Sequence, residues 1–528
     1  MLNKTILYIA CAAVLVSGTS VVAAPQAESG FTPIFDGKSL DGWDGNPKFW
    51  RVEDGCITGQ TTKENRTKGN TFLIWRDGFV DNFELRLEYK IVGGNSGIQY
   101  RSFEPGPKWV VGGYQADFEA GKTWSGILFG EKYRKVLAGR GKKTVLTRTA
   151  GKFESKVVEE VGDPKEIQSK IKSEEWNSYR IVADGYNLQH FINDVKTCEC
   201  TDNDVQMRRA TGILAVQLHA GPPMKVQFRN VRIKRLPAKK KIVLIAGTRS
   251  HGYGSHEHKA GCMLLADALN KSGLPIEASV TTEGWPKDDS ILNDADSVVI
   301  YCDGGGRHPF NKHLDRVQEL TTRGTGIVCI HYGVETVKGE AGNAFMKWTG
   351  GYFEPHWSVN PHWVANYKKL PSHPITRGVK PFRINDEWYY HMRFMEDMQG
   401  VTPILTDLPP DSTLKRKNGA HSGNPAVRNA IAEGKPQHMA WARQRPDAGR
   451  GFGFTGGHFH WNWGNNDFRK LVLNAIAWTA HAEVPAKGVA SKTLSLEDLK
   501  ANQDYEPNGR FNAARIEDLL KEWNGAEE

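Results

Sequence analysis

The chain has 528 residues, of which 39% are hydrophobic and 24% charged, a balance typical of soluble globular domains. One hydrophobic core rarely organises so long a chain, so we expect at least two domains. The net charge of +9 is spread along the sequence apart from a short lysine-rich segment near residue 240, and we expect no nucleic-acid partner.

Residues 1–23 have the pattern of a secretory signal peptide. Lys4 lies in a basic start, an apolar stretch runs from Thr5 to Gly18, and Ala23 ends a group of small residues suited to cleavage. This pattern differs from that of a membrane span. We therefore expect an exported protein, periplasmic or secreted, without an integral membrane segment.

Residues 31–236 are predicted to form an all-β domain. Short stretches of alternating apolar and polar residues, for example 83–89, 176–182 and 226–233, are separated by Gly, Asp and Asn. Many short strands with turn signals between them indicate a sandwich or jelly roll. A charged segment that contains Pro237 then follows as a linker.

Residues 240–482 are predicted to form an α/β domain. Continuous apolar runs at 242–246, 297–301 and 326–330 are typical of buried parallel strands. Helical patterns at 260–269, 314–321 and 468–480 alternate with them or follow them, which predicts a doubly wound sheet. Residues 483–528 form a polar tail with two short amphipathic stretches, which we expect to pack on the surface.

Three predicted strands in the first domain, at 97–101, 114–119 and 212–219, carry polar residues at alternate positions. Residues two apart on a strand share a face. Amide, guanidinium, carboxylate and imidazole groups on one face are suited to binding a sugar and moving a proton. The alternative is an ordinary solvated outer face. The residues predicted to share this face are Gln99, Arg101, Gln115, Asp117, Gln217 and His219.

The first domain resembles the 3-keto-disaccharide hydrolase family. The resemblance rests on the motifs Phe35–Trp43, Asn95–Arg101, Glu175–Arg180 and Gln217–Asn230. It implies a concanavalin-like jelly roll that acts on sugars oxidised at carbon 3. The ketone acidifies the hydrogen on carbon 2; a base removes it, the group on carbon 1 leaves, and water adds to complete a net hydrolysis.

The residues of the polar face take roles in this hypothesis. His219 or Asp117 is the base, and Arg101 with Gln99 stabilises the enolate oxygen. The remaining polar residues are expected to bind the sugar; they are Gln115, Glu119 and Gln217. In an alternative, Gln115 and Glu119 hold a divalent cation.

The second domain is rich in histidine, with 15 of the chain's 17 between His251 and His481. Several follow predicted strands, and in a doubly wound sheet these segments gather at the carboxyl edge, where ligands bind. Clustered His and Glu predict a divalent transition-metal site, such as zinc, with buried scaffolding as the alternative for each histidine. The expected ligands are His256, His258, His331, His458 and His460; Trp363 and Trp461 are expected to stack on a sugar.

The second domain resembles the trehalose-utilisation (ThuA-like) family, whose fold is that of class I glutamine amidotransferases. The resemblance rests on residues 246–260, 361–363, 386–390 and 451–463. His331 stands where an amidotransferase has its nucleophilic cysteine, so we do not expect glutamine hydrolysis. No Gly-x-Gly-x-x-Gly motif follows the first strand, so we expect no NAD or flavin. A separate sugar 3-dehydrogenase would then make the ketone.

Three functions remain open from the sequence. The leading one is an exported enzyme that cleaves 3-keto-glycosides in its first domain. In the alternative, the jelly roll only binds sugar and the ThuA-like domain is a metal-dependent enzyme on sugar derivatives. The third is a structural protein of the cell envelope.

Overall fold

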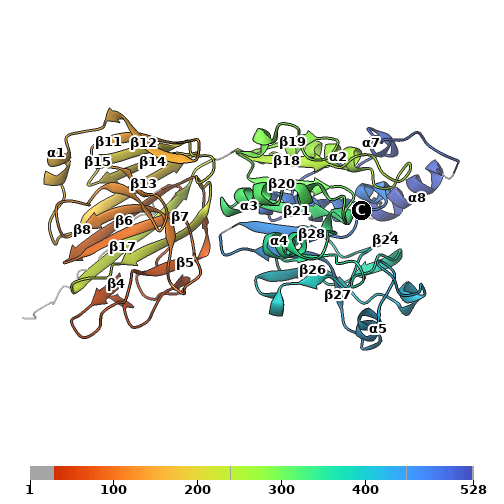
Figure 1. The fold of residues 1–528 in the computed structure, drawn as a ribbon, viewed down its shortest axis with the longest axis horizontal. Coiled ribbons are helices and arrows are strands. Elements are labelled where there is room, and N and C mark those ends of the chain that lie inside the picture. Colours follow the sequence, from red (N-terminus) through yellow and green to blue (C-terminus); the bar gives the residue numbers. More distant parts are fainter. Residues whose placement is uncertain (1–28, 238, 448, 510, 526–528) are drawn as a thin grey trace, which may run out of the picture.

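The computed structural model describes residues 29–237, 239–447, 449–509 and 511–525. An all-β domain is followed by an α/β domain, and a short segment joins them between β17 (Met224–Arg235) and β18 (Lys240–Ala246) (Figure 1). This multidomain arrangement confirms the fold class expected from the sequence. The expected signal peptide lies outside the described residues. None of the described helices is both long and apolar enough to cross a bilayer.

The first domain is a sandwich of two sheets. One sheet has the order β12-β11-β15-β14-β13-β6-β17-β4-β3 with β1 beside β17, and the other has the order β10-β9-β8-β7-β16-β5-β2. Their elements are β1 (Thr32–Pro33), β2 (Trp43–Asp44), β3 (Trp50–Glu53), β4 (Cys56–Thr61), β5 (Thr71–Val80), β6 (Phe83–Val92), β7 (Asn95–Phe103), β8 (Gly112–Glu119), β9 (Ile127–Glu131), β10 (Lys135–Ala138), β11 (Lys142–Thr149), β12 (Lys152–Glu160), α1 (Pro164–Ser169), β13 (Asn177–Asp184), β14 (Asn187–Ile192), β15 (Val195–Asp202), β16 (Gly212–Leu218) and β17 (Met224–Arg235).

The core of the sandwich lies between the two sheets, and strand alternation explains it. In β6, Phe83, Leu85 and Leu87 are buried while the residues between them are partly exposed. In the second sheet, Phe118 and Val216 point into the same core. The opposite face of this second sheet therefore receives the polar residues of β7, β8 and β16.

The second domain is built on one sheet with the order β19-β18-β20-β21-β28-β27-β26. The first five strands are parallel, and β27 pairs antiparallel with both β28 and β26. Its elements are β18 (Lys240–Ala246), α2 (His258–Lys271), β19 (Ile276–Thr281), β20 (Ser297–Tyr301), α3 (Leu314–Thr322), β21 (Gly326–Ile330), α4 (Glu340–Thr349), β22 (Gly351–Tyr352), β23 (Trp363–Tyr367), β24 (Phe382–Asp386), β25 (Arg393–Phe394), β26 (Val401–Asp407), α5 (Pro425–Ala432), β27 (Gln437–Gln444), β28 (Arg450–Phe454), α6 (Asn466–Thr479), α7 (Leu496–Lys500) and α8 (Ala513–Asn524).

The five parallel strands have the flavodoxin-like order, in which the second strand along the chain lies outside the first. Both faces of the sheet are covered. Leu244 packs into one core with residues of α2 and α6, while Val243 and Ile245 pack into another with residues of α3 and α4. Burial on both faces explains why these strands are continuous apolar runs in the sequence.

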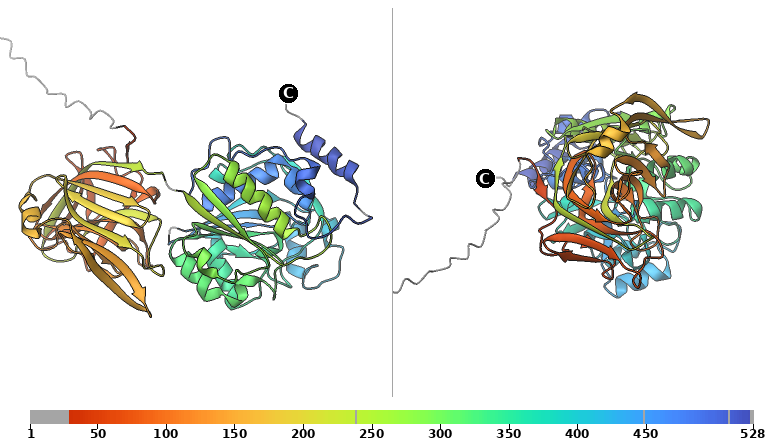
Figure 2. Two further views of the ribbon diagram at one scale, coloured as in Figure 1. Left: turned by 90° about the horizontal axis from the view of Figure 1, so that it is seen from above. Right: turned by 90° about the vertical axis from the view of Figure 1, so that its left-hand side faces the viewer.

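Polar contacts join the two domains directly. Arg209 of the sandwich is almost fully buried, and its guanidinium donates to the carbonyl oxygens of Thr322 and Asp447 in the α/β domain. The ammonium group of Lys240 lies 2.8 Å from the Asp81 carboxylate. At the far end of the molecule, α8 packs on the outside of the α/β domain (Figure 2).

Candidate functional sites

An open cleft of about 380 Å³ lies where β16 and β8 end, and Asn95, Glu119 and His219 line it. His219 Nδ1 is 2.5 Å from the carbonyl oxygen of Ala220. A carbonyl can only accept, so Nδ1 carries a proton, and in the neutral ring Nε2 is the acceptor. The imidazole is therefore in the tautomer that can take a proton from a ligand.

Asp117 lies directly behind the cleft and is 6% exposed. Its Oδ1 accepts a hydrogen bond of 2.9 Å from the Asn95 side-chain amide, which itself lines the cleft. Burial raises the pKa of Asp117 to about 7, although the hydrogen bond from Asn95 opposes the shift. A carboxyl group with this pKa can exchange a proton near neutral pH.

Glu119 lines the cleft but also holds a turn. Its Oε1 accepts hydrogen bonds from the backbone N–H groups of Thr123, at 2.5 Å, and Trp124, at 2.9 Å. The carboxylate thus stabilises the loop that follows β8, and the rim of the cleft depends on it.

The three glutamines share a face, as expected, but they are buried and bind one another. The Gln115 side-chain oxygen accepts from the amide of Gln99 at 2.6 Å and from that of Gln217 at 3.0 Å. At most 1% of each side chain is exposed. The expectation that they contact a sugar or an enolate is corrected: they form a buried amide chain beneath the cleft.

The role expected for Arg101 is also corrected. The register of β7 against β8 shifts between Tyr100 and Phe103, and Arg101 has a φ of +46°. Such a bulge redirects a side chain. The buried guanidinium donates to the carbonyl oxygens of Asp81 (2.7 Å) and Gly185 (2.6 Å), away from the cleft-lining residues. Arg101 therefore holds turns of the sandwich together.

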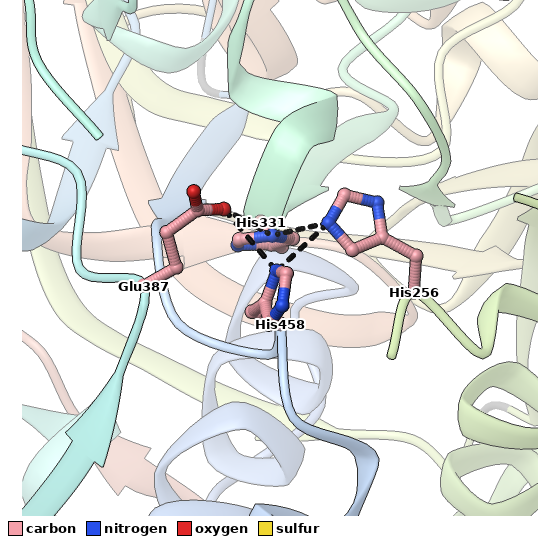
Figure 3. A group of neighbouring side chains, drawn as sticks. All are labelled: His256, His331, Glu387 and His458. Carbon is pink, nitrogen blue, oxygen red and sulfur yellow. Dashed lines mark hydrogen bonds and ion pairs between the residues drawn. The ribbon is translucent and has the colours of Figure 1, made fainter. Parts of the chain in front are cut away.

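The α/β domain brings three histidines and one glutamate together at the carboxyl edge of its sheet (Figure 3). His256 follows β18, His331 follows β21, His458 follows β28 and Glu387 follows β24. His256 Nε2 is 3.0 Å from His458 Nδ1 and 3.1 Å from His331 Nε2. Glu387 Oε2 is 3.2 Å from His458 Nδ1. These four residues, the His/Glu cluster, could share one metal ion.

Two of these imidazoles, those of His331 and His256, contact neighbouring groups through their second ring nitrogen, Nδ1. His331 Nδ1 lies 2.8 Å from the Thr455 carbonyl oxygen, and His256 Nδ1 lies 3.0 Å from Asp303 Oδ1. Burial would raise the pKa of Asp303, but hydrogen bonds from His256 and Ser250 lower it to about 2, so it is a carboxylate. Burial also lowers the pKa of His256 to about 4. Burial lowers the pKa of His331 as well, so both imidazoles are neutral, with the proton on Nδ1.

Asp386 and Glu387 each contribute to the cluster in a different way. Asp386 is fully buried, and its carboxylate accepts from the backbone N–H groups of Gly457 (2.7 Å) and His458 (3.0 Å). This fixes the turn that presents His458. Glu387 Oε1 accepts from the Asn360 amide at 3.1 Å, which leaves Oε2 to face the histidines.

The backbone at the cluster is strained. His256 has a φ of +52° and His331 a φ of +53°, in the left-handed region that residues other than glycine seldom adopt. Such conformations persist where the surrounding structure enforces them, and they concentrate at functional sites.

Two histidines and two tryptophans do not have the roles predicted for them from the sequence. His258 donates Nδ1–H to the Thr248 carbonyl oxygen (3.0 Å), and its Nε2 lies 3.6 Å from Asp303; His460 is fully buried elsewhere. Trp363 is 6% exposed and donates its indole N–H to a backbone carbonyl, and Phe511 of the tail packs against Trp461. Neither of these histidines belongs to the cluster, Trp363 is too buried to stack on a sugar, and Trp461 is partly covered by Phe511.

Glu387 and Asp303 are site residues that were not predicted from the sequence. Both follow strands, β24 and β20, by one or two residues. Because ligands gather at the carboxyl ends of strands, Asp303 was predictable: it follows the buried strand predicted at 297–301. Glu387 required the tertiary structure, because β24 belongs to a separate two-stranded sheet.

Fold and sites together define a two-domain protein, in which a β-sandwich with an acid–base cleft precedes an α/β domain with a His/Glu cluster. Residues 30–234 match the family model of 3-keto-alpha-glucoside-1,2-lyase-like domains, and residues 242–479 match that of trehalose utilisation (ThuA). The chain thus carries a 3-keto-glucoside-lyase-like domain followed by a ThuA domain, which confirms both resemblances.

Individual proteins match parts of the chain. A 3-keto-disaccharide hydrolase of Bacteroides thetaiotaomicron is 41% identical over 88 residues, which is 15% of this chain and 30% of that protein. A structure from Parabacteroides distasonis, provisionally described as a glycosyl hydrolase, is 22% identical and covers 39% of this chain and 94% of its own, with a TM-score of 0.25. A structure from Bacteroides uniformis, provisionally described as ThuA-like, is 15% identical; the match covers 46% of this chain and 92% of that protein, with a TM-score of 0.35.

Proposed function

We propose that the chain is a hydrolase that cleaves 3-keto-glycosides in the cleft of its sandwich domain. The observation that carries the proposal is His219, whose Nδ1 is committed to the Ala220 carbonyl while Nε2 is free at an open cleft. The family match of residues 30–234 and the name of the matching B. thetaiotaomicron protein support this substrate class.

The proposed reaction begins with proton transfer from carbon 2 of the sugar to His219 Nε2. The electron pair of that bond forms an enolate with the carbon 3 ketone, then returns as the bond from carbon 1 to the leaving oxygen breaks. The leaving oxygen takes a proton, and water adds across the new double bond. The sum is hydrolysis of the glycoside, without the carboxylate pair that ordinary glycosidases use.

Asp117 is the second acid–base group of this proposal. Its pKa of about 7 allows it to hold or release a proton during turnover, and Asn95 connects it to the cleft. Asp117 as the base and His219 as the proton donor is the alternative assignment. Gln99 and Arg101 have no part in either version, because both side chains are buried among other partners.

The wider setting of the enzyme is also proposed. The chain is exported, and a separate sugar 3-dehydrogenase supplies its substrate, since no dinucleotide-binding motif follows β18. The cofactor of the chain is a divalent metal ion in the α/β domain. Within the described residues, the groups of three or more His, Cys, Asp or Glu side chains that could share an ion lie in that domain.

The test is incubation of the purified protein with 3-keto-trehalose and, separately, with trehalose, in D₂O and with product analysis by mass spectrometry. We expect cleavage of the keto-sugar alone and uptake of deuterium at carbon 2. His219→Ala should abolish both, whereas His356→Ala, at an exposed site, should change neither. Binding of the keto-sugar without cleavage or exchange would instead support a sugar-binding sandwich and a catalytic ThuA domain.

A further inference from the structure

The ligand atoms of the His/Glu cluster all lie within 4.8 Å of one another. His331 Nδ1 faces the Thr455 carbonyl at 2.8 Å, and a carbonyl can only accept, so this nitrogen carries the proton. The same reasoning applies to His256 Nδ1, which faces the Asp303 carboxylate at 3.0 Å. In this tautomer Nε2 carries no proton, and in each ring it faces the other cluster residues.

These two unprotonated nitrogens lie 3.1 Å apart in a buried site. Two lone pairs cannot hydrogen-bond to each other, and the donors beside them are His458 Nδ1, 3.0 Å from His256 Nε2, and the Tyr389 hydroxyl, 3.3 Å from His331 Nε2. The Glu387 carboxylate adds negative charge, because its Oε2 lies 3.6 Å from His331 Nε2 and 3.2 Å from His458 Nδ1. The arrangement calls for a cation between the four groups.

We propose that His256, His331, His458 and Glu387 bind one divalent transition-metal ion. This inference rests on the proposed presence of a divalent cofactor, and it names the ligands and the class of ion. Ligand atoms about 2.0–2.1 Å from a tetrahedral ion lie roughly 3.3 Å from one another. Four of the six separations in the cluster, 3.0 to 3.6 Å, bracket that value, and all six are within 4.8 Å.

The donor set selects the ion. Three imidazole nitrogens and one carboxylate suit zinc and its first-row neighbours, whereas magnesium and calcium prefer sites made of oxygen atoms. The partners of the imidazoles also fit, because metal-bound histidines usually donate their second nitrogen to a carboxylate or a carbonyl. Asp303 and the Thr455 carbonyl occupy these two positions.

The experiment uses the full chain, stripped with a chelator and then loaded with Zn²⁺, Mn²⁺, Co²⁺, Mg²⁺ or Ca²⁺. Bound ion per chain is measured by plasma mass spectrometry, and affinity by competition with a chromophoric chelator. We expect one transition-metal ion per chain, and a visible Co²⁺ spectrum of nitrogen-rich coordination. A chain that prefers Mg²⁺ or Ca²⁺ would overturn the inference.

The ligands are tested with His331→Gln and Glu387→Gln, each checked for folding by circular dichroism, against His438→Gln as a histidine control on β27. We expect the two ligand variants to lose at least about 100-fold in affinity, more than the 10- to 100-fold typical of outer partners, and the control to lose none. Ion binding that is indifferent to both ligand variants would overturn this site but leave the proposed cofactor standing. No ion binding at all would overturn both, and neither result would bear on cleavage in the sandwich.

Discussion

The carboxylate of Glu257 accepts a hydrogen bond of 2.8 Å from the backbone N–H of Asp504, although the two residues lie 247 positions apart. The same carboxylate accepts from the Gly254 N–H at 3.0 Å. Glu257 is 1% exposed and directly follows the cluster residue His256. The C-terminal segment, which neither family model covers, is thus attached to the loop that carries a proposed metal ligand.

Glu257→Ala should weaken metal binding about 10-fold, because the loop that places His256 in its strained conformation loses two hydrogen bonds. The affinity is measured by the same chelator competition. Glu497→Ala removes an exposed glutamate from the same segment and should leave the affinity unchanged. Equal affinity in the wild type and Glu257→Ala would mean that the tail does not position the ligand.

Asp117 predicts a pH dependence of activity. With a pKa raised by burial to about 7, its carboxylate forms only as the pH rises through that value. If Asp117 is the base, log(kcat/KM) should rise with pH below about 7 and level off above it. Asp117→Asn should remove turnover, while Asp194→Asn, at an exposed turn, should keep the wild-type profile. A profile that is flat between pH 5 and 8 would exclude Asp117 as the base.

The same shift predicts how stability depends on pH. The unfolded carboxyl releases its proton near pH 3.8 and the folded one near pH 7. Between these values the native state binds more protons, so the contribution of Asp117 to stability falls as pH rises. Urea unfolding of the wild type and Asp117→Asn should therefore show a stability difference that changes between pH 4 and 7. A difference independent of pH would contradict the raised pKa.

The buried amide chain should matter for stability. Gln115→Leu leaves the side-chain N–H donors of Gln99 and Gln217 without their shared acceptor. Two unpaired buried donors should lower the free energy of unfolding by about 2–5 kcal/mol. Chemical denaturation measures the loss, and Gln189→Leu, at a half-buried site on β14, serves as control with a change within about 0.5 kcal/mol. Similar stability of the two variants would refute the role of the chain.

Arg209 should couple the unfolding of the two domains, because its buried guanidinium donates to carbonyl oxygens of the α/β domain. Arg209→Met leaves those carbonyls unpaired and should separate one thermal transition into two in scanning calorimetry. Arg66→Met, at an exposed site, should retain the wild-type trace. A single unchanged transition in Arg209→Met would show that the domains are joined by other contacts.

Local periodicity was enough to predict much of the fold. Continuous apolar runs predicted β20 (Ser297–Tyr301) and β21 (Gly326–Ile330) with the bounds that the structure has, because strands buried on both faces have no polar positions. Alternation likewise assigned the polar residues of three strands to one face, and the residues between them, such as Phe118 and Val216, lie in the core of the sandwich. The carboxyl-edge rule then brought His256, His331 and His458 to one region.

The exact membership of each site depended on contacts between residues distant in the sequence. A bulge turned Arg101 away from the polar face, and three glutamines on that face paired with one another, which alternation alone does not reveal. Glu387 joined the histidines from a separate small sheet, while His258 and His460, each two residues from a cluster residue, lie outside the cluster. Amino-acid pattern determines which face or edge a side chain occupies; only three-dimensional packing determines which partner it meets there, because hydrogen bonds and ion binding require separations of about 3 Å.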